Sequence, residues 1–339
     1  CATMEDALAK LQRGQFIMIR EGTAARNLEA LAPLLTPQYA ERCMFCTDDK
    51  HPSDLLEKGH IDYIAREAIN KYGVDPIIAV KAACHHASRY FLLNNRGAIA
   101  PGYLADFAVI DNFKDFNVEM VFKKGVLYWN NGELRDFEAP KIEEYLDKRA
   151  HDTFHVSTLT PDDFRDTRQR GVLGMVPGEI ITTDNGYADH VDLEKDILKI
   201  AVVERHKGTH HIGLGYIQGY GLKSGAVATS ISHDSHNIIV VGTNEEDMAA
   251  AVNRVVALGG GIVVMDGGKV LGEVQLQIAG IMSEEPLVDV NRELENAKEK
   301  AFALGVSRGV DPFMTLSFMA LPVIPTLRLT TRGVFDTVT

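Results

Sequence analysis

The chain has 339 residues, of which 45% are hydrophobic and 24% charged, a composition typical of a globular protein with two or three domains. Its 35 Lys and Arg residues stand against 47 Asp and Glu residues, which gives a formal net charge of -12. This charge argues against nucleic acid or an anionic membrane as the main partner, because both need clustered positive charge. No apolar run approaches the ~18 residues of a membrane span.

Four cysteines in a chain of this length favour a reducing, cytoplasmic compartment over a disulfide scaffold. Cys43 and Cys46 have CxxC spacing, but residues three apart on a strand point to opposite faces, so one site cannot easily use both. The first residues show neither the basic region nor the apolar stretch of a signal peptide. Thr3 begins a capped helix with no strand before it, so we expect a fragment of a longer protein.

Strand and helix patterns alternate over residues 1–96 and predict the end of a right-handed βα series. Apolar periodicity, Gly stops and the Asp75-Pro76 helix start define the expected elements. These are helices at 4–13, 27–35, 61–72 and 77–91, and buried strands at 15–20 and 43–46.

The apolar run that begins at Cys43 ends in two adjacent carboxylates, Asp48 and Asp49. In parallel sheets and barrels, chemistry gathers at the carboxyl ends of the strands, which is where this pair lies. Even spacing predicts that Asp48, Cys46 and Met44 share one strand face, with Asp49 pointing elsewhere. The alternative is that the pair only caps the following turn, since Asp favours such positions.

Beyond residue 96 the pattern changes. Residues 97–139 combine turns, a strand and a hairpin about Lys124-Gly125, which predicts a small β module. Residues 140–171 read as a charged, largely helical connector. Residues 172–339 predict a separate α+β domain, with a strand starting at Gly178, Gly-rich turns over 213–225 and helices at 244–258 and 289–304.

A polar stretch from His233 to Asn237 stands directly before an apolar strand. Sequence neighbours rarely converge into a Ser-His-Asp relay, and the stretch has too few ligands for a complete metal site. Polar groups beside a core are costly without partners, which favours a functional role. A self-bonded polar turn remains the alternative.

Taken together, these features resemble the latter part of a bacterial-type adenine deaminase of the amidohydrolase superfamily. The resemblance rests on the run 18–24 with its Arg20-Glu21-Gly22 turn, the 45–49 run with the Asp pair, and the Pro-Gly-x-x-Ala-Asp pattern ending at Asp106. In the second half it rests on 232–237 and on 327–333. The similarity covers essentially the whole chain.

The resemblance implies an α/β fold: the last part of a metal-dependent (β/α)8 barrel, a small β-sandwich and a C-terminal α+β domain. It implies two divalent ions, manganese or iron and possibly zinc, in the complete enzyme. The early His-x-His pair, the bridging carboxylate and the middle-strand histidines of the family are absent from this chain. The implied partners are therefore the missing N-terminal barrel portion, adenine, and further copies in a homodimer or higher homo-oligomer.

The resemblance also implies the reaction, hydrolytic deamination of adenine to hypoxanthine and ammonia in purine salvage. In that family an Asp in the position of Asp48 is both metal ligand and proton shuttle for a metal-bound water. The implied substrate contacts are Arg20, Glu21, Asp49, His233, Asp234, His236 and Asn237. Alone, this fragment is expected to be inactive.

Two other functions remain open. One is a different amidohydrolase, dihydroorotase-like or acting on another cyclic amide, which the Pro-Gly-x-x-Ala-Asp pattern fits equally but the 233–237 stretch does not. The other is a non-catalytic module that acts as a subunit or interaction partner, which the missing metal ligands support.

Overall fold

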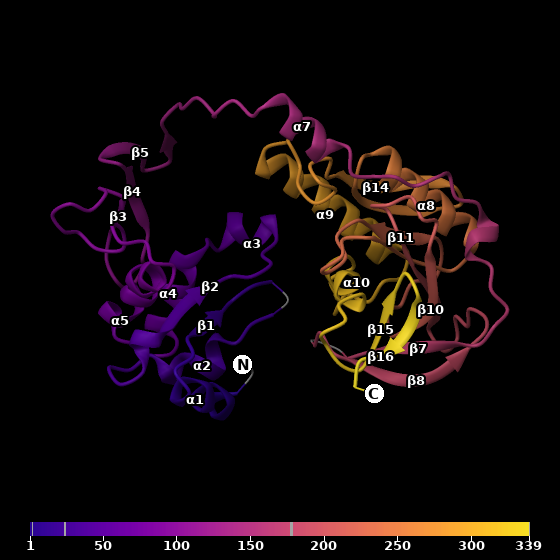
Figure 1. Ribbon diagram of the computed structural model, residues 1–339, viewed down its shortest axis with the longest axis horizontal. Coiled ribbons are helices and arrows are strands. Elements are labelled where there is room, and N and C mark those ends of the chain that lie inside the picture. The colour runs from indigo at the N-terminus through magenta and orange to yellow at the C-terminus, as the bar shows by residue number, and fades with distance from the viewer. Residues whose placement is uncertain (2, 24, 177–178, 339) are drawn as a thin grey trace. The chain divides into compact units, whose positions relative to one another are not determined.

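The computed structural model describes residues 1, 3–23, 25–176 and 179–338, and its chain falls into two units, Cys1–Pro140 and Lys141–Thr339 (Figure 1). Ala24 and Gly178, which entered the sequence predictions, lie outside the described residues. Within the described part, no helix combines the length and the apolar character needed to cross a membrane. The finer boundaries at 96/97 and 171/172 stay predictions.

Two parallel strands form the centre of the first unit. β1 (Ile17–Arg20) pairs with β2 (Cys43–Cys46), with Ile17 opposite Cys43 and Arg20 opposite Cys46. Apolar helix faces pack around this pair into one buried core. The helices are α1 (Met4–Gln12), α2 (Leu28–Leu31), α3 (Pro52–Glu57), α4 (Ile61–Asn70), α5 (Pro76–Val80) and α6 (His86–Tyr90), the last two joined by a π-helical turn. The predicted strand–helix alternation is confirmed.

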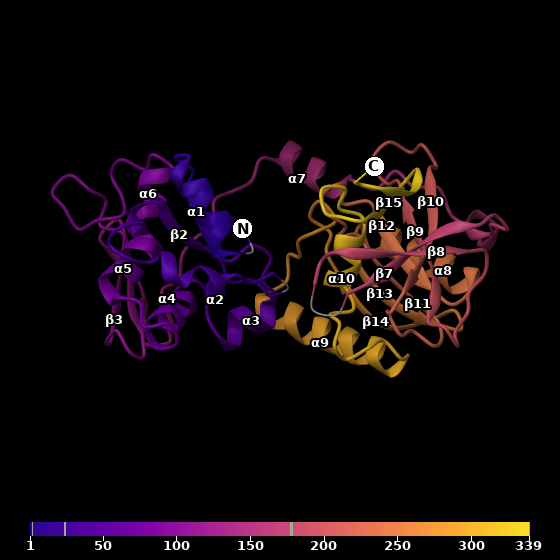
Figure 2. The same ribbon diagram turned by 90° about the horizontal axis from the view of Figure 1, so that it is seen from below.

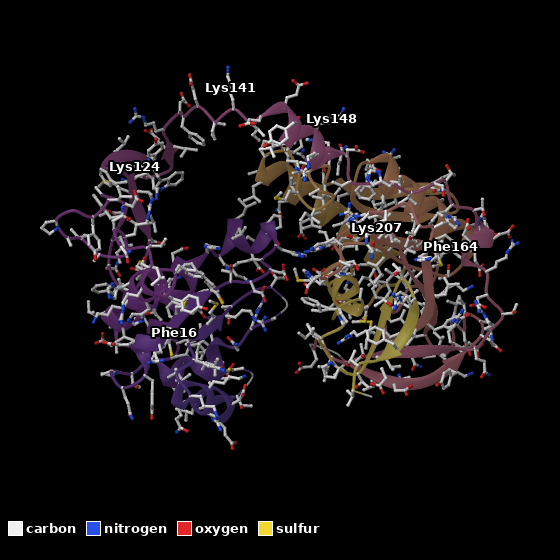
Figure 3. All side chains as sticks on the ribbon, in the orientation of Figure 1. Phe16, Lys124, Lys141, Lys148, Phe164 and Lys207 are labelled. Carbon is white, nitrogen blue, oxygen red and sulfur yellow. The ribbon has the colours of Figure 1, made fainter. Side chains whose placement is uncertain are left out.

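A four-stranded antiparallel sheet completes the first unit. Its strands, in order, are β3 (Phe107–Ile110), β4 (Val118–Lys123), β5 (Val126–Asn130) and β6 (Glu133–Leu134). Lys124, labelled in Figure 3, and Gly125 both have positive φ, 49° and 76°. Two such residues make the tight turn whose twist suits a hairpin, which confirms the hairpin predicted about these positions.

The segment after Pro140 is less helical than predicted. It contains α7 (Glu144–His151) and a 3₁₀ turn at Pro161–Phe164, and is otherwise irregular up to β7. The side chain of Asp163 accepts a hydrogen bond from the backbone of Thr160, which closes a capping box on that short turn. Phe164 is fully buried (Figure 3), and Lys199 Nζ donates to its carbonyl at 3.1 Å, so the end of this segment is anchored in the second unit.

An eight-stranded sheet organises the second unit, in the order β14-β13-β11-β12-β9-β10-β7-β8. Its neighbours run antiparallel except β10 and β7, which are parallel. The strands are β7 (Arg170–Met175), β8 (Thr182–Ala188), β9 (Ile197–Val203), β10 (Ile212–Gln218), β11 (Ala226–Thr229), β12 (Ile238–Gly242), β13 (Gly261–Asp266) and β14 (Lys269–Gln275).

Both faces of this sheet are covered. α8 (Glu245–Ala257) packs on one face through Met248, Val252 and Val255. On the other face lie α9 (Leu287–Ala303), α10 (Met314–Met319) and the hairpin of β15 (Leu327–Thr330) and β16 (Gly333–Asp336). Figure 2 shows α9 running beside β14, which it contacts. Central strands buried on both sides explain the near-continuous apolar runs in this half of the sequence.

The prediction of Gly-rich turns over 213–225 is wrong at its start, because β10 is a regular strand there. A Cβ at Gly213 would collide with the backbone of Thr330, and one at Gly215 with the side chain of Val334. The β15–β16 hairpin contacts β10 at this point (Figure 1). Gly213 therefore marks a close approach of two backbones, and Gly215 makes room for the Val334 side chain.

We expect Gly213→Ala to destabilise the second unit by about 2 kcal/mol, because the neighbour it would strike is backbone and cannot move aside as a side chain would. Calorimetric unfolding of the chain measures this. Gly309→Ala is the control, since its Cβ would meet only Ser307 Oγ at 3.9 Å. Equal melting temperatures for the two variants would contradict the prediction.

Candidate active site

The loops that follow β1 and β2 lie side by side, because parallel strands end at the same edge of a sheet. Glu21 N donates to Cys46 O at 3.0 Å, and Thr23 N donates to Asp49 O at 3.0 Å. Between them, Gly22 allows the approach: a Cβ there would lie 2.5 Å from Thr47 O. The Arg-Glu-Gly turn and the Asp pair thus form one constellation.

Asp48 pairs with Arg20 across this edge. Arg20 Nη1 donates to Asp48 Oδ2 at 2.5 Å, and their side chains are 34% and 45% exposed. Asp48 has φ 57°, a left-handed conformation that Asp tolerates better than most residues. Because β2 ends at Cys46, the strand alternation used to align Asp48 with Cys46 and Met44 does not extend to Asp48.

Glu21 is the buried acid of the constellation, with its side chain 14% exposed and Arg26 Nε 4.0 Å from Oε1. Burial raises the pKa of Glu21 above its usual value, and the nearby Arg26 charge only partly opposes this. Glu21 therefore keeps a proton to higher pH than a free glutamate. Such a carboxyl can donate a hydrogen bond as well as accept one.

Thr23 and Asp54 were not identified from the sequence. Thr23 Oγ1 donates to Asp54 Oδ2 at 2.6 Å and accepts from His51 N at 2.9 Å. Burial opposes ionisation of Asp54, but hydrogen bonds from Lys58 and Thr23 outweigh it, so the pKa of Asp54 is lowered. These bonds tie the loop after β1 to the start of α3. No local pattern indicates them, since they join residues about thirty apart.

The CxxC pair has no role in a thiol site. Burial raises the pKa of Cys43 to about 12 and also raises that of Cys46, so neither sulfur ionises readily. Both are free cysteines. The nearby His86 is buried, and its Nδ1 lies 2.9 Å from Cys43 O, which indicates a packing role for this histidine.

The polar stretch 233–237 lies in the second unit, between β11 and β12. The imidazoles of His233 and His236 have centroids 5.6 Å apart, and the His233 ring lies 5.0 Å from that of Phe318. The side chain of His233 is 15% exposed and that of Asp234 is 81% exposed. Asn237 is buried, with its Nδ2 donating to Ser235 Oγ at 3.2 Å.

His236 is held in a strained backbone conformation with φ 49°. Its amide donates to Ser232 O at 2.6 Å, and its Nδ1 accepts from Ser232 N at 3.4 Å. Burial lowers the pKa of His236, and the charges of His233 and Arg205 act in the same direction. The imidazole is therefore neutral at physiological pH and can both donate and accept.

Each unit thus gathers its own set of predicted residues. The first unit brings together Arg20, Glu21, Asp48 and Asp49, and the second brings together His233, Asp234, His236 and Asn237. That the second set serves the first stays a prediction.

Comparison with known families gives a match in each unit. Residues 6–128 match the amidohydrolase family, and residues 178–339 match the adenine deaminase C-terminal domain. Across 99% of its length the chain is 44% identical to an adenine deaminase of Desulfatibacillum aliphaticivorans. The chain thus matches adenine deaminases over nearly its whole length, with an amidohydrolase portion followed by an adenine deaminase C-terminal domain. The amidohydrolase match confirms the predicted fold class.

Other relatives match a similar share of this chain. An adenine deaminase of Kosmotoga olearia is 42% identical over the whole chain. The chain spans 60% and 59% of the lengths of these two relatives. Among solved structures, a beta-aspartyl dipeptidase of Fervidobacterium islandicum AW-1 overlaps 40% of this chain and 36% of its own, with a TM-score of 0.33 and 22% identity.

Amidohydrolases are generally metal-dependent, but the described residues do not form a two-metal centre at Asp48. Among them, the one group of three or more converging His, Cys, Asp or Glu ligands is Asp147, His151 and Glu284, which lies in the second unit. Asp48 and Asp49 by themselves do not make up a ligand set of three among the described residues. The donor set fits part of such a centre and not the whole.

We expect Thr23→Val to lower the free energy of unfolding of the first unit by about 1 to 2 kcal/mol, because it removes a hydrogen bond at each end of the Thr23 hydroxyl. Urea unfolding followed by tryptophan fluorescence reports this unit, since the chain's single tryptophan, Trp129, lies in β5. Thr23→Ser keeps the hydroxyl and should stay close to the parent. A valine variant as stable as the serine variant would show that the Thr23 hydrogen bonds do not stabilise this unit.

Proposed function

We propose that this chain is the carboxyl-terminal part of an adenine deaminase, which hydrolyses adenine to hypoxanthine and ammonia in purine salvage. Relatives bearing that name match 99% or more of the chain at 44% and 42% identity. The observation that carries the proposal is the Asp48 carboxylate beside the Arg-Glu-Gly turn at the carboxyl edge of β1 and β2. A half-exposed carboxylate at that edge is placed for proton transfer to a bound molecule.

In this proposal Asp48 moves the protons. Water adds to C6 of adenine, Asp48 takes a proton from that water, and the proton passes to the exocyclic nitrogen, which leaves as ammonia. The second hydrogen of the water passes to N1, and the ring keeps the oxygen as the C6 carbonyl of hypoxanthine. Asp48 returns to its carboxylate form, so it is unchanged after each turnover.

Arg20 and Glu21 supply purine contacts. The Arg20–Asp48 pair is partly exposed, so it contributes little stability and can exchange its partner when a ligand arrives. Glu21, whose side chain is only 14% exposed, is proposed to hydrogen-bond the purine while staying largely out of bulk water. Asp49 lies on the same edge and is proposed to support the purine-facing loop.

The divalent centre is proposed to be shared. Asp48 supplies one ligand, and the others come from a barrel portion outside residues 1–339, with manganese or iron, and possibly zinc, as the two ions. This chain by itself is proposed to be inactive. Assembly as a homodimer or higher homo-oligomer in the cytoplasm is part of the same proposal.

His233, Asp234, His236 and Asn237 are proposed to hydrogen-bond the purine from the second unit. Because Nδ1 of His236 already accepts from Ser232 N, its Nε2 is left to donate to a ring nitrogen of adenine. The specificity of the pocket for adenine would then depend on this stretch.

In the enzyme completed by its remaining barrel portion, we expect Asp48→Asn to lower kcat about 10²- to 10⁴-fold, the usual contribution of a general acid–base group. Ammonia release from adenine measures turnover, and bound metal should fall in parallel. Glu41→Gln is the control, since Glu41 forms another exposed pair with an arginine, Arg89, at 3.6 Å. Full turnover by the Asn variant would reject the role of Asp48.

In the same enzyme, His236→Ala should lower kcat/KM for adenine about tenfold, the effect of one hydrogen bond worth about 1.4 kcal/mol. His190→Ala is the matched control, because His190 is an exposed histidine of the same unit with a carboxylate, Asp189, at 2.6 Å. If both variants behave like the parent, the 233–237 stretch is a structural turn.

A further inference from the structure

Arg205, directly after β9, carries a guanidinium that is almost fully enclosed by the protein. The residue is 2% exposed and lies over the ring of Phe154 at 4.2 Å. Its Nε donates to His236 O at 2.5 Å, its Nη2 to Ala279 O at 2.8 Å and its Nη1 to Thr153 O at 2.8 Å. These acceptors are all backbone carbonyls and therefore neutral.

Burying such a charge is costly. Burial lowers the pKa of Arg205 to about 10, with only the charge of Glu204 opposing it, so the group stays protonated near neutral pH. An apolar side chain would fill the same space at lower cost. What the guanidinium adds at this place is a set of directional donors to three backbone carbonyls.

Arg205 and its neighbours hold three successive positions of the polar stretch. His206 Nε2 donates to Ser235 O at 2.7 Å, Arg205 Nε donates to His236 O, and Arg205 N donates to Asn237 Oδ1 at 3.2 Å. We call residues 204–206 the bracket. These three bonds of the bracket end on the segment that carries the proposed purine contacts.

The side chain of Glu204 fixes the turn that carries the bracket. Its carboxylate accepts from the amides of His206 and Lys207, and from the amide and hydroxyl of Thr209. Burial disfavours the charge, but these bonds prevail and lower the pKa of Glu204 to about 2. The carboxylate thus remains ionised and holds the turn in one conformation at neutral pH.

The left-handed backbone at His236 explains why a bracket is required. A non-glycine residue with φ 49° is strained by roughly 1 kcal/mol or more and persists only when its surroundings fix it. The Arg205 bond to the carbonyl of that residue supplies such a constraint. Without it, the peptide after His236 could relax and carry the imidazole with it.

We propose that Arg205 is a positioning residue for purine binding, which acts by holding the backbone of His236 and Asn237. The proposal rests on the proposed function, since it assumes that this stretch contacts adenine. Arg205 itself touches no ligand in this scheme. Its loss would weaken substrate binding more than the chemical step.

Arg328 provides a matched control within the same unit. It is 0% exposed, and burial lowers its pKa to about 10, as for Arg205. Its guanidinium donates to the carbonyls of Ile324, Ile180 and Pro325, and not to the 233–237 stretch. Its replacement therefore measures the cost of removing a buried guanidinium without disturbing the bracket.

The first experiment uses the chain of residues 1–339 and does not depend on catalysis. NMR titration follows the imidazole of His236, assigned with His236→Gln, in Arg205→Met, Arg205→Lys and Arg328→Met. The groups that act on His236 are His233, Arg205 and His206, which lower its pKa, and Asp234, which raises it. Removing the Arg205 charge should thus shift the His236 pKa upward, and Arg328→Met should leave it unchanged.

Arg205→Lys separates the effect of the charge from that of the hydrogen-bond geometry. It also keeps the proposal testable if Arg205→Met does not fold. It keeps the charge but not the planar fork, so the His236 amide and ring signals should shift while the pKa stays nearer the parent value. Parent-like His236 signals in both Arg205 variants would overturn the proposal.

The second experiment uses the completed enzyme. Both Arg205 variants should raise the KM for adenine about tenfold or more with a smaller change in kcat, with lysine closer to the parent, while Arg328→Met keeps the parent KM even if it melts earlier. If the parent enzyme does not deaminate adenine, the proposed function fails whatever the NMR result. If the parent is active and Arg205→Met keeps its KM, the positioning role fails alone.

Discussion

The parallel pairing of β1 with β2 is the constraint on which the first site depends. It brings the ends of two strands to one edge, so residues 20–23 and 46–49 meet although they are far apart in sequence. Gly22 then permits backbone contact between the loops, and Thr23 ties one of them to α3. The carboxylate of Asp48 is placed by this framework and not by the strand itself, which has already ended.

A different device positions the polar stretch of the second unit. There the sheet is covered on both faces, and the loop between β11 and β12 has no neighbouring parallel strand end to define it. Its backbone is instead held by donors from the turn after β9, above all the guanidinium of Arg205. One site thus depends on strand register and the other on a buried charge.

Periodicity and capping residues predicted much of the fold. The helix beginning after Thr3, the helix over 61–70 and the hairpin at Lys124-Gly125 follow from local rules and are present. The prediction failed at β10, because its glycines make room for a hairpin that lies more than a hundred residues later in the chain. For the site, motifs indicated Asp48 and His236, but Thr23 and Arg205 act through contacts that no local pattern records.

The two key arginines show how burial decides what one side chain can do. Arg20 and Asp48 remain in contact with water, so their attraction is screened and either partner can be exchanged at small cost. Arg205 is enclosed, so each of its hydrogen bonds is strong and each would be expensive to leave unmade. An exchangeable pair suits a site where a substrate or a cation must enter. A buried guanidinium bonded to several backbone carbonyls suits a framework that keeps a strained histidine in place.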